Sequence, residues 1–167
     1  MADSFSRFPA TETARLRLRS LGRGDADALH AVTDDPVVGA SIVIFSPPFT
    51  LADTQALLDR WDGRADIMTG AWRKADGALM GVVALHLRGR DELEIGYWFG
   101  SAFHGQGYAG EAVSATVSSV RRYLPHRRIY AECRPANFGS WRVLEKAGFR
   151  ATGEDGERPE RKRLVLL

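Results

Sequence analysis

The chain has 167 residues, of which 44% are hydrophobic and 26% are charged. These proportions are typical of one globular domain and exclude a disordered or fibrous protein. The formal net charge of +2 gives no bulk electrostatic reason to bind nucleic acid or an anionic membrane surface. No apolar stretch approaches the roughly 20 residues of a membrane-spanning helix, and the first residues show no secretory pattern. We therefore expect a cytoplasmic protein.

The cysteine and histidine positions give no sign of redox or metal chemistry. Cys133 is the single cysteine and has no partner for an internal disulfide or a CxxC pair. His30 and His86 lack a second ligand at metal-binding spacing, so no metal site is expected. A cluster of arginines between residues 121 and 128 suits a helix C-terminus better than a nucleic-acid surface.

The first predicted elements are a strand and a helix. Residues 1–12 are polar and aperiodic, which indicates a frayed end. Apolar and charged residues alternate over residues 13–20, and this alternation predicts a half-buried strand. Asp25 suits the N-cap of a helix that stops before Pro36. Residues 37–49 mix prolines with an apolar run, so we expect a long, partly ordered loop or a short helix there.

Thr50 opens the second predicted helix, with Asp53 in the position of a capping box. Three antiparallel strands follow it, separated by turns at Asp76-Gly77 and at residues 89–91. We place these strands at residues 67–73, 78–87 and 93–99. In the last of them, Leu93, Ile95, Tyr97 and Phe99 share one face, and Glu94, Gly96 and Trp98 share the other.

The remaining elements alternate between helix and strand. Apolar residues from Val113 to Leu124 recur at helical spacing, and a strand follows over residues 128–133. Asn137 caps a helix that runs to Ala147, and two short strands over residues 149–153 and 161–167 end the chain. The order predicts one mixed α+β domain over residues 13–167, with a mostly antiparallel sheet flanked by about four helices.

A glycine-rich segment joins the third antiparallel strand to the next helix. Backbone N–H groups and the dipole of a helix N-terminus form a phosphate site, although such a segment can also be a tight turn that binds nothing. Gly105-x-Gly107-x-x-Gly110 satisfies the dinucleotide fingerprint, and Glu132 lies near the acidic position expected about 20 residues later. Hairpins precede the segment, however, and five residues separate it from its strand, which argues against a dinucleotide-binding unit.

Four short motifs, in this order, resemble those of GNAT-superfamily N-acetyltransferases. The resemblance is strongest to the branch that contains ribosomal-protein-alanine N-acetyltransferases, and it covers the chain from about Thr13 to its end. Within the acyl-CoA pyrophosphate loop, His104 stands where the superfamily has Gln or Arg. The motifs are Thr13-x-Arg15-Leu16-x-Leu18-Arg19, Asp34-Asp35-Pro36, His104-x-x-Gly107-x-Ala109 and Asn137-x-x-Ser140-x-x-x-x-Glu145-Lys146-x-Gly148-Phe149.

The resemblance implies a GNAT-like fold, acetyl-CoA as acyl donor and a primary amine as acceptor. Within the branch, the preferred acceptor is a protein N-terminal α-amine. A small-molecule amine and a non-catalytic acyl-CoA-binding module stay open as alternatives, as does a homodimer. The donor-binding residues implied are Trp98 and Phe99 through their main chain, together with His104, Gly105, Gln106, Gly107, Tyr108, Ala109, Gly110, Asn137 and Ser140.

Acetyl transfer from a thioester requires a base for the amine and an acid for the departing thiolate. An α-amine has a pKa near 8, so a modest base suffices. Glu94 is the candidate base if its face of the strand lines the cleft; otherwise it is a solvated strand glutamate. Ser140 is the candidate acid, because the branch has a serine here that reaches the CoA sulfur. A helix-capping role for Asn137 and Ser140 explains the same residues without catalysis.

Overall fold

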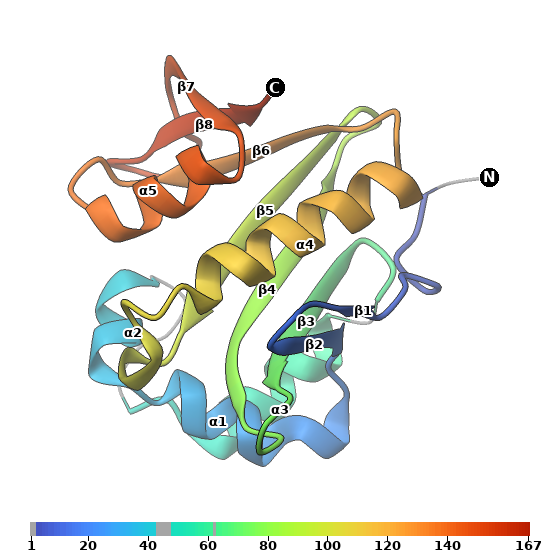
Figure 1. The fold of residues 1–167 in the computed structure, drawn as a ribbon, viewed down its shortest axis with the longest axis vertical. Helices are drawn as coiled ribbons and strands as arrows, with labels where there is room; N and C mark the ends of the chain where they lie inside the picture. The colour runs from blue at the N-terminus through green and yellow to red at the C-terminus, as the bar shows by residue number, and fades with distance from the viewer. Residues whose placement is uncertain (1–2, 43–47, 62) are drawn as a thin grey trace.

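An eight-stranded mixed sheet with helices on both faces forms the centre of the molecule (Figure 1). The computed structural model describes residues 3–42, 48–61 and 63–167. The strands are β1 (Thr11–Glu12), β2 (Leu16–Ser20), β3 (Asp66–Arg73), β4 (Leu79–Arg88), β5 (Glu92–Phe99), β6 (Arg128–Cys133), β7 (Phe149–Asp155) and β8 (Lys162–Leu166). Their order across the sheet is β1-β2-β3-β4-β5-β6-β8-β7, and only the β5–β6 pair is parallel.

The described residues contain five α-helices and two short 3-10 helices, and α1, α3, α4 and α5 follow the order that the sequence pattern predicts. None of these helices is long and apolar enough to span a membrane. The α-helices are α1 (Ala26–Thr33), α2 (Pro36–Ser41), α3 (Leu51–Arg60), α4 (Tyr108–Tyr123) and α5 (Phe138–Lys146), and the 3-10 helices are η1 (Arg23–Asp25) and η2 (Ser101–Phe103).

Helix α2 is one more than the four helices expected, and local chemistry accounts for it. Pro36 occupies the first turn, where its missing N–H costs nothing. The Asp35 side chain caps the same turn by accepting from the Val37 N–H at 2.9 Å. The sequence pattern left a short helix open here, and the structure contains it. Residues 43–47 of the predicted loop lie outside the described residues.

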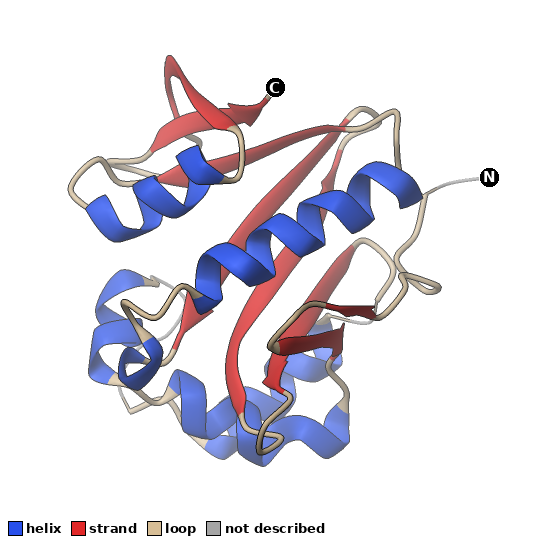
Figure 2. Ribbon diagram, viewed as in Figure 1, coloured by secondary structure: helices blue, strands red, loops and turns tan. Residues whose placement is uncertain are grey.

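Helices cover both faces of the sheet (Figure 2), and each face carries its own apolar core. Helix α4 packs on one face through Val113, Val117 and Val120, and it meets strand residues such as Ile95 there. Helices α1 and α3 cover the other face, where Trp98 joins the second core. The alternation along β5 therefore places its odd-numbered residues toward α4 and its even-numbered residues toward α1.

The N-terminal segment is ordered against the core, which corrects the expectation of a frayed end for residues 3–12. Phe5 is 1% exposed, and its N–H donates to the Arg64 carbonyl at 2.9 Å. Phe8 packs edge-to-face with Phe5 and with Tyr123, at ring-centroid distances of 5.8 and 5.4 Å. Two aromatic side chains anchor a segment whose sequence has no period, because their burial outweighs the entropy of ordering it.

Strands β5 and β6 separate partway along their length. Their pairing runs from Glu92↔Arg128 to Glu94↔Tyr130 and stops there, although both strands lie wholly within the described residues. Beyond that point β6 continues its pairing on β8 instead. A Cβ built on Gly96, the second β5 residue past the separation, meets nothing within 4 Å. The sheet is therefore open between the C-terminal halves of β5 and β6.

Candidate active site

A cleft of about 930 Å³ occupies the opening between β5 and β6. It is bordered by the end of β5, the glycine-rich segment before α4, the start of α5, the end of α2 and the turn between β7 and β8. The structure brings every predicted site residue except Gln106 to its wall: Glu94, Trp98, Phe99, His104, Gly105, Gly107, Tyr108, Ala109, Gly110, Asn137 and Ser140.

The glycine-rich segment forms a concave end of this cleft. Gly105 and Gly107 have φ of +73° and +82°, a left-handed conformation that glycine adopts without strain. Gly107 is the N-cap residue of α4, and no side chain caps that helix. The N–H groups of its first turn are therefore available to an anion, with the helix dipole adding to the attraction. The segment therefore has the chemistry of an anion-binding cradle.

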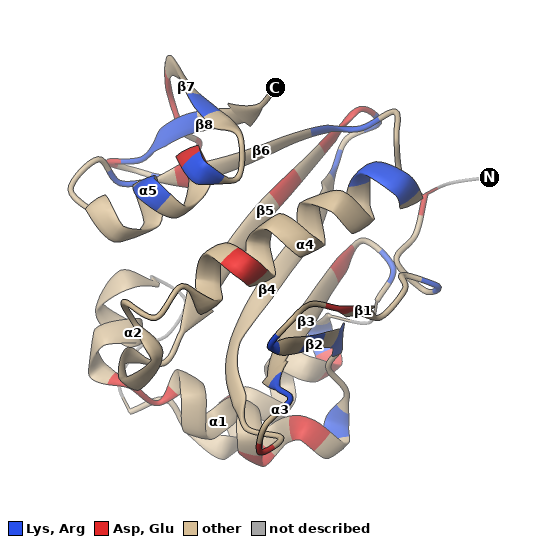
Figure 3. Ribbon diagram, viewed as in Figure 1, with Lys and Arg blue, Asp and Glu red and all other residues tan. Residues whose placement is uncertain are grey.

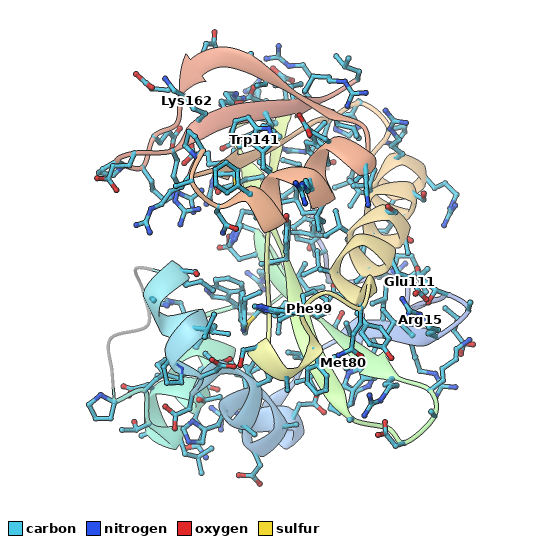
Figure 4. All side chains as sticks on the ribbon, turned by 60° about the vertical axis from the view of Figure 1, so that its left-hand side comes forward. Arg15, Met80, Phe99, Glu111, Trp141 and Lys162 are labelled. Carbon is cyan, nitrogen blue, oxygen red and sulfur yellow. The ribbon has the colours of Figure 1, made fainter. Side chains whose placement is uncertain are left out.

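A brace from the segment between β1 and β2 holds the cradle in place, and Arg15 and Glu111 mark it in Figure 4. Glu111, in the first turn of α4, accepts from Arg15 Nε at 2.7 Å and from the Thr13 hydroxyl at 2.5 Å. Arg15 also donates to the Gln106 carbonyl at 3.0 Å, and its guanidinium lies 4.1 Å from the centre of the Tyr108 ring. Burial raises the pKa of Glu111, but these donors lower it more, so the net pKa lies below its ordinary value.

His104 and Gln106 turn toward the protein. His104 Nε2 lies 2.7 Å from the Phe99 carbonyl. Because a carbonyl only accepts, Nε2 carries the hydrogen of this bond. The Gln106 amide donates to the Ala102 carbonyl at 3.0 Å. His104 thus fastens the loop to the end of β5, which is marked by Phe99 in Figure 4, and it leaves phosphate contact chiefly to the backbone.

Trp98 contributes packing through its side chain. The indole lies in the second core, 7% exposed, and its Nε1–H donates to the Thr33 hydroxyl at 3.1 Å. Asp35 ties the same helical layer to the segment after β5, because its carboxylate accepts from the Ser101 N–H at 2.7 Å. The Asp34-Asp35-Pro36 motif therefore positions the floor of the cleft beside the end of β5.

We call the wall formed by Tyr97, Cys133, Asn137 and Ser140 the hydroxyl side of the cleft. The Tyr97 hydroxyl lies 2.6 Å from Ser140 Oγ and donates to the Ser140 carbonyl at 2.9 Å. Asn137 caps α5 by accepting from the Ser140 N–H at 3.1 Å. Burial raises the pKa of Tyr97 far above its ordinary value and also raises the pKa of Cys133. All of these groups are therefore neutral at physiological pH.

Tyr97 is a functional candidate that the sequence pattern assigned to the core. It does share the core face of β5, but its hydroxyl reaches the cleft and meets Ser140. The signal for such a role was available, since a buried tyrosine hydroxyl almost always needs a polar partner. The identity of that partner, 43 residues away in the chain, depends on how α5 docks.

We call the opposite wall, formed by Glu94, Glu132, Arg158 and Arg161, the ionic side. The Glu94 side chain is 6% exposed, so it is not a solvated strand glutamate. Its Oε2 accepts from Arg88 Nε and Nη2 at 3.1 and 2.9 Å, and its Oε1 contacts Arg158 Nη2. Arg158 Nε donates to Glu132 Oε2 at 3.0 Å. Burial, followed by repulsion from Arg161 and Arg88, lowers the pKa of the Arg158 guanidinium.

The sequence pattern indicated Glu132 only as part of a dinucleotide site, and it did not identify Arg158 or Arg161 as residues of the cleft. Glu132 is buried and also accepts from the N–H groups of Glu157 and Arg158, at 2.7 and 3.2 Å, so it holds the β7–β8 turn against β6. Alternation with Ala131 and Cys133 was the available signal, because it places Glu132 on the same face of the sheet as Glu94. The arginines of the turn carry no periodic signal.

Comparison with known proteins bears on this site. A family profile described as an acetyltransferase (GNAT) domain matches residues 15–150. The uncharacterised N-acetyltransferase YnaD of Bacillus subtilis (strain 168) is 29% identical over 144 residues, which cover 84% of this chain and 82% of that protein. An acetyltransferase of the GNAT family from Bacillus anthracis has a TM-score of 0.83 at 28% identity, covering 95% of this chain and 98% of its own. A ribosomal-protein-alanine acetyltransferase from Vibrio fischeri shares the fold, with a TM-score of 0.81, 19% identity and 94% coverage of both chains.

Proposed function

Because the chain belongs to the GNAT family of acetyl-CoA-dependent N-acetyltransferases, we propose that its acceptor is the α-amine of a protein or peptide N-terminus. The observation that carries this proposal is the pairing of a buried carboxylate, Glu94, with a neutral hydroxyl, Ser140, on opposite walls of one cleft. A carboxylate is a weak base, which suits an amine with a pKa near 8 better than a lysine amine near 10.4. The fold shared with the Vibrio fischeri alanine acetyltransferase agrees with this acceptor.

Acetyl-CoA is the donor substrate, and the shape of the cleft supports one orientation for it. The backbone of residues 104–110 would hold the diphosphate at the start of α4. The edge of β5 at Trp98 and Phe99, which has no β6 partner, would guide the pantetheine arm through its main chain. Asn137, at the start of α5, would border that arm. This orientation brings the thioester between the hydroxyl side and the ionic side, above Gly96, where a Cβ would meet open space.

The proposed reaction is direct attack of the amine on the thioester. Glu94 takes a proton from the amine, directly or through one water, and the nitrogen forms its bond to the carbonyl carbon. Collapse of the tetrahedral intermediate breaks the C–S bond. Ser140 Oγ then donates a proton to the sulfur and recovers one from solvent. The strand backbone beside Gly96 is the nearest source of N–H groups for the oxyanion.

Tyr97 acts in this scheme as a positioning residue. Its hydroxyl lies 2.6 Å from Ser140 Oγ and fixes the serine rotamer. Because burial raises the pKa of Tyr97, the phenol stays protonated, and in the structure its one hydrogen donates to the Ser140 carbonyl. In the proposed reaction this hydrogen rotates onto Ser140 Oγ, 2.6 Å away, and takes the place of the hydrogen bond that Ser140 donates to Tyr97. Ser140 then keeps its own hydrogen free for the sulfur.

A panel of amines tests the acceptor. Release of CoA thiol is followed with an alanine-terminated peptide, the same peptide with a blocked N-terminus and an internal lysine, spermidine and free alanine. We expect turnover with the free N-terminus, and mass spectrometry should locate the acetyl group on the α-amine. Turnover with spermidine alone would replace the proposal with a small-molecule acetyltransferase.

Thermal unfolding distinguishes the remaining alternatives. At 100 times its dissociation constant, a ligand stabilises the folded state by about 2.7 kcal/mol, and we expect this from acetyl-CoA and desulfo-CoA. Stabilisation by NAD alone would favour the dinucleotide interpretation of Gly105-x-Gly107-x-x-Gly110. Stabilisation by the CoA compounds without thiol release from any amine would indicate a non-catalytic binding module.

A further inference from the structure

The ionic side of the cleft contains a guanidinium that no carboxylate neutralises. Arg161 donates from Nη1 to the Glu132 carbonyl at 3.1 Å and from Nη2 to the Ser41 carbonyl at 3.3 Å. Both acceptors are main-chain groups, and within the described part of the chain no carboxylate forms a salt bridge with Arg161. Its Nε is buried and has no hydrogen-bond partner there. An unpaired, partly buried charge is costly unless a ligand completes it.

Arg134 repeats the same feature on the neighbouring segment. Its Nε is also buried without a hydrogen-bond partner among the described residues. The charged group nearest to that nitrogen is Glu160 Oε2, at 3.8 Å, on a side chain that is 81% exposed. Both arginines therefore line the cleft with an Nε–H that has no hydrogen-bond partner among the described residues, and the one salt bridge to either of them there, Arg134–Glu160, is long and exposed.

The carboxylates of the cleft are already engaged elsewhere. Glu94 and Glu132 both pair with Arg158, and Glu94 also pairs with Arg88. The cleft has a surplus of positive charge, and Lys and Arg are frequent on α5 and β8 (Figure 3). Its lining contains two carboxylates, Glu94 and Glu132, against five cationic side chains, Arg134, Arg142, Lys146, Arg158 and Arg161.

The positions of these cations indicate that they meet two different ligands. Arg142 and Lys146 lie on α5, which follows the hydroxyl side, so they are placed to meet anionic groups of the donor substrate. Arg161 lies on the β7–β8 turn and reaches across to the end of α2 at Ser41. That region is on the ionic side, away from the phosphate cradle at residues 104–110. An anion bound there must belong to the other substrate.

We propose that Arg161 and Arg134 bind a carboxylate of the acceptor, so that the preferred substrate is an amine with a carboxylate close to the reacting nitrogen. A guanidinium presents parallel N–H groups that match a carboxylate in bidentate geometry. This inference rests on the proposed transfer to an α-amine and narrows it. The carboxylate has two possible sources: an acidic side chain at the second or third position of a peptide, or the α-carboxylate of a free amino acid.

The test compares pairs of acceptors that differ in one charge. The peptides Ala-Glu-Ala-Gly and Ala-Gln-Ala-Gly, with amidated C-termini, examine the side-chain source, and alanine with alaninamide examines the free α-carboxylate. Each pair is assayed with the wild-type protein and with Arg161→Gln, Arg161→Lys and Arg134→Gln. Arg60→Gln is the matched control, because Arg60 is exposed at the end of α3 and does not line the cleft.

We expect the wild-type protein and Arg60→Gln to prefer the carboxylate member of at least one pair by about 10-fold or more in kcat/KM, as hydrogen bonds to a charged group predict. Arg161→Gln should abolish most of this preference, Arg134→Gln part of it, and Arg161→Lys should be intermediate because it keeps the charge without the fork. The KM for acetyl-CoA should stay within about twofold of the wild-type value. The pair that shows the preference identifies the source.

Several results would overturn the inference. Equal turnover of both members of each pair, or a preference for the uncharged member, removes the carboxylate site. A rise in the acetyl-CoA KM of Arg161→Gln with unchanged acceptor preference assigns the guanidinium to the donor. A preference for phosphoethanolamine over ethanolamine, with no carboxylate preference, makes the anion a phosphate.

Failure of the proposed function gives a different result. If no amine is acetylated, calorimetric titration of the CoA-loaded protein with Ala-Glu-Ala-Gly and Ala-Gln-Ala-Gly still decides the inference. Tighter binding of the glutamate peptide, lost in Arg161→Gln, supports the carboxylate site even without turnover. Equal binding of both peptides rejects it. If Arg161→Gln does not unfold cooperatively, Arg161→Lys replaces it, because that change is the more conservative one.

Discussion

The hydroxyl side and the ionic side line the same cleft, yet one consists of neutral groups and the other of charged groups. On the hydroxyl side, Tyr97 and Ser140 are neutral groups joined by a 2.6 Å hydrogen bond. On the ionic side, Glu94 and Glu132 share the guanidinium of Arg158. In the proposed reaction, a thiolate leaves on the first side and the amine loses its proton on the second. Each wall therefore presents the type of group that its half of the reaction consumes.

The contrast also concerns rigidity. A network of buried charges holds its members in place, because removing one partner leaves another buried charge unpaired. A pair of hydroxyl groups can exchange donor and acceptor roles by rotating O–H bonds, with no movement of heavy atoms. The ionic side is thus built to hold an acceptor and a base in a fixed geometry, whereas the hydroxyl side is built to move a proton. Five substitutions examine this division and the elements that support it.

Glu94→Gln should have the largest effect, because it removes the proposed base while keeping its shape. General-base catalysis contributes about 10²–10⁴-fold, and we expect kcat to fall by about 100-fold or more. The dissociation constant for acetyl-CoA, measured by calorimetry, should change little. Glu132→Gln is the matched control, because it disturbs the same Arg158 pairing from the adjacent strand without removing the base. Equal losses in the two variants would make Glu94 a structural member of the network.

Ser140→Ala and Tyr97→Phe test the opposite wall, and we expect smaller losses there. A thiol with a pKa near 8.5 is a competent leaving group without full protonation, so Ser140→Ala should lower kcat about 10-fold. Tyr97→Phe should lower kcat a few-fold and destabilise the fold by about 1 kcal/mol, the usual contribution of one hydrogen bond. Because Tyr97 acts through Ser140, the double variant should resemble Ser140→Ala alone. Additive losses in kcat would show that Tyr97 acts independently of Ser140.

The phosphate cradle and the hydroxyl side differ from the ionic side in how much of each could be predicted from the sequence. The phosphate cradle and the start of α5 lie in contiguous motifs, residues 104–110 and 137–140, so local spacing was enough to place them. The ionic side combines Glu94, Glu132 and Arg158, which come from three distant segments. The parallel β5–β6 register and the docking of the β7–β8 turn bring them together, and neither follows from periodicity.

The helices and strands could be predicted where the sequence has a local pattern, and the prediction failed where that pattern was absent. The capping box at Thr50 and Asp53 is present in the structure as the sequence predicts. Residues 3–12 were expected to fray because they have no period. Two aromatic rings, Phe5 and Phe8, nevertheless order them by packing near Tyr123, and such tertiary burial is invisible to a local reading.

Arg15→Gln asks whether the cradle depends on its brace as much as the ionic side depends on its network. The change removes the salt bridge to Glu111 and the hydrogen bond to the Gln106 carbonyl. The Arg15 side chain is 44% exposed, so the loss in stability should stay below about 1 kcal/mol. We expect the KM for acetyl-CoA to rise about threefold to fivefold, with kcat unchanged. Arg17→Gln, two residues further along the chain but paired with Glu12 away from the cradle, should leave that KM unchanged.

His86→Gln, the smallest expected effect, tests how far the ionic side extends beneath the sheet. His86 lies directly opposite Glu94 in the β4–β5 register, and its Nδ1 is 2.6 Å from Asp66 Oδ1. Burial lowers the pKa of His86 below its ordinary value of 6.5, and repulsion from Arg88 and Arg158 adds to this, whereas Asp66 opposes it. The unfolded chain therefore binds this proton more tightly than the folded protein does.

The sign of the pH dependence follows from that difference in proton binding. Stability due to neutral His86 is complete above about pH 6.5, and it is lost as the pH falls below that value toward the folded pKa, with a slope of at most about 1.4 kcal/mol per pH unit. Urea unfolding between pH 5 and 8 should show the wild-type protein losing more stability on acidification than His86→Gln does. His126→Gln, a surface histidine paired with Asp3 outside this network, serves as the control. Parallel curves for the wild type and His86→Gln would mean that burial and the neighbouring charges do not lower the pKa of His86 in the folded protein.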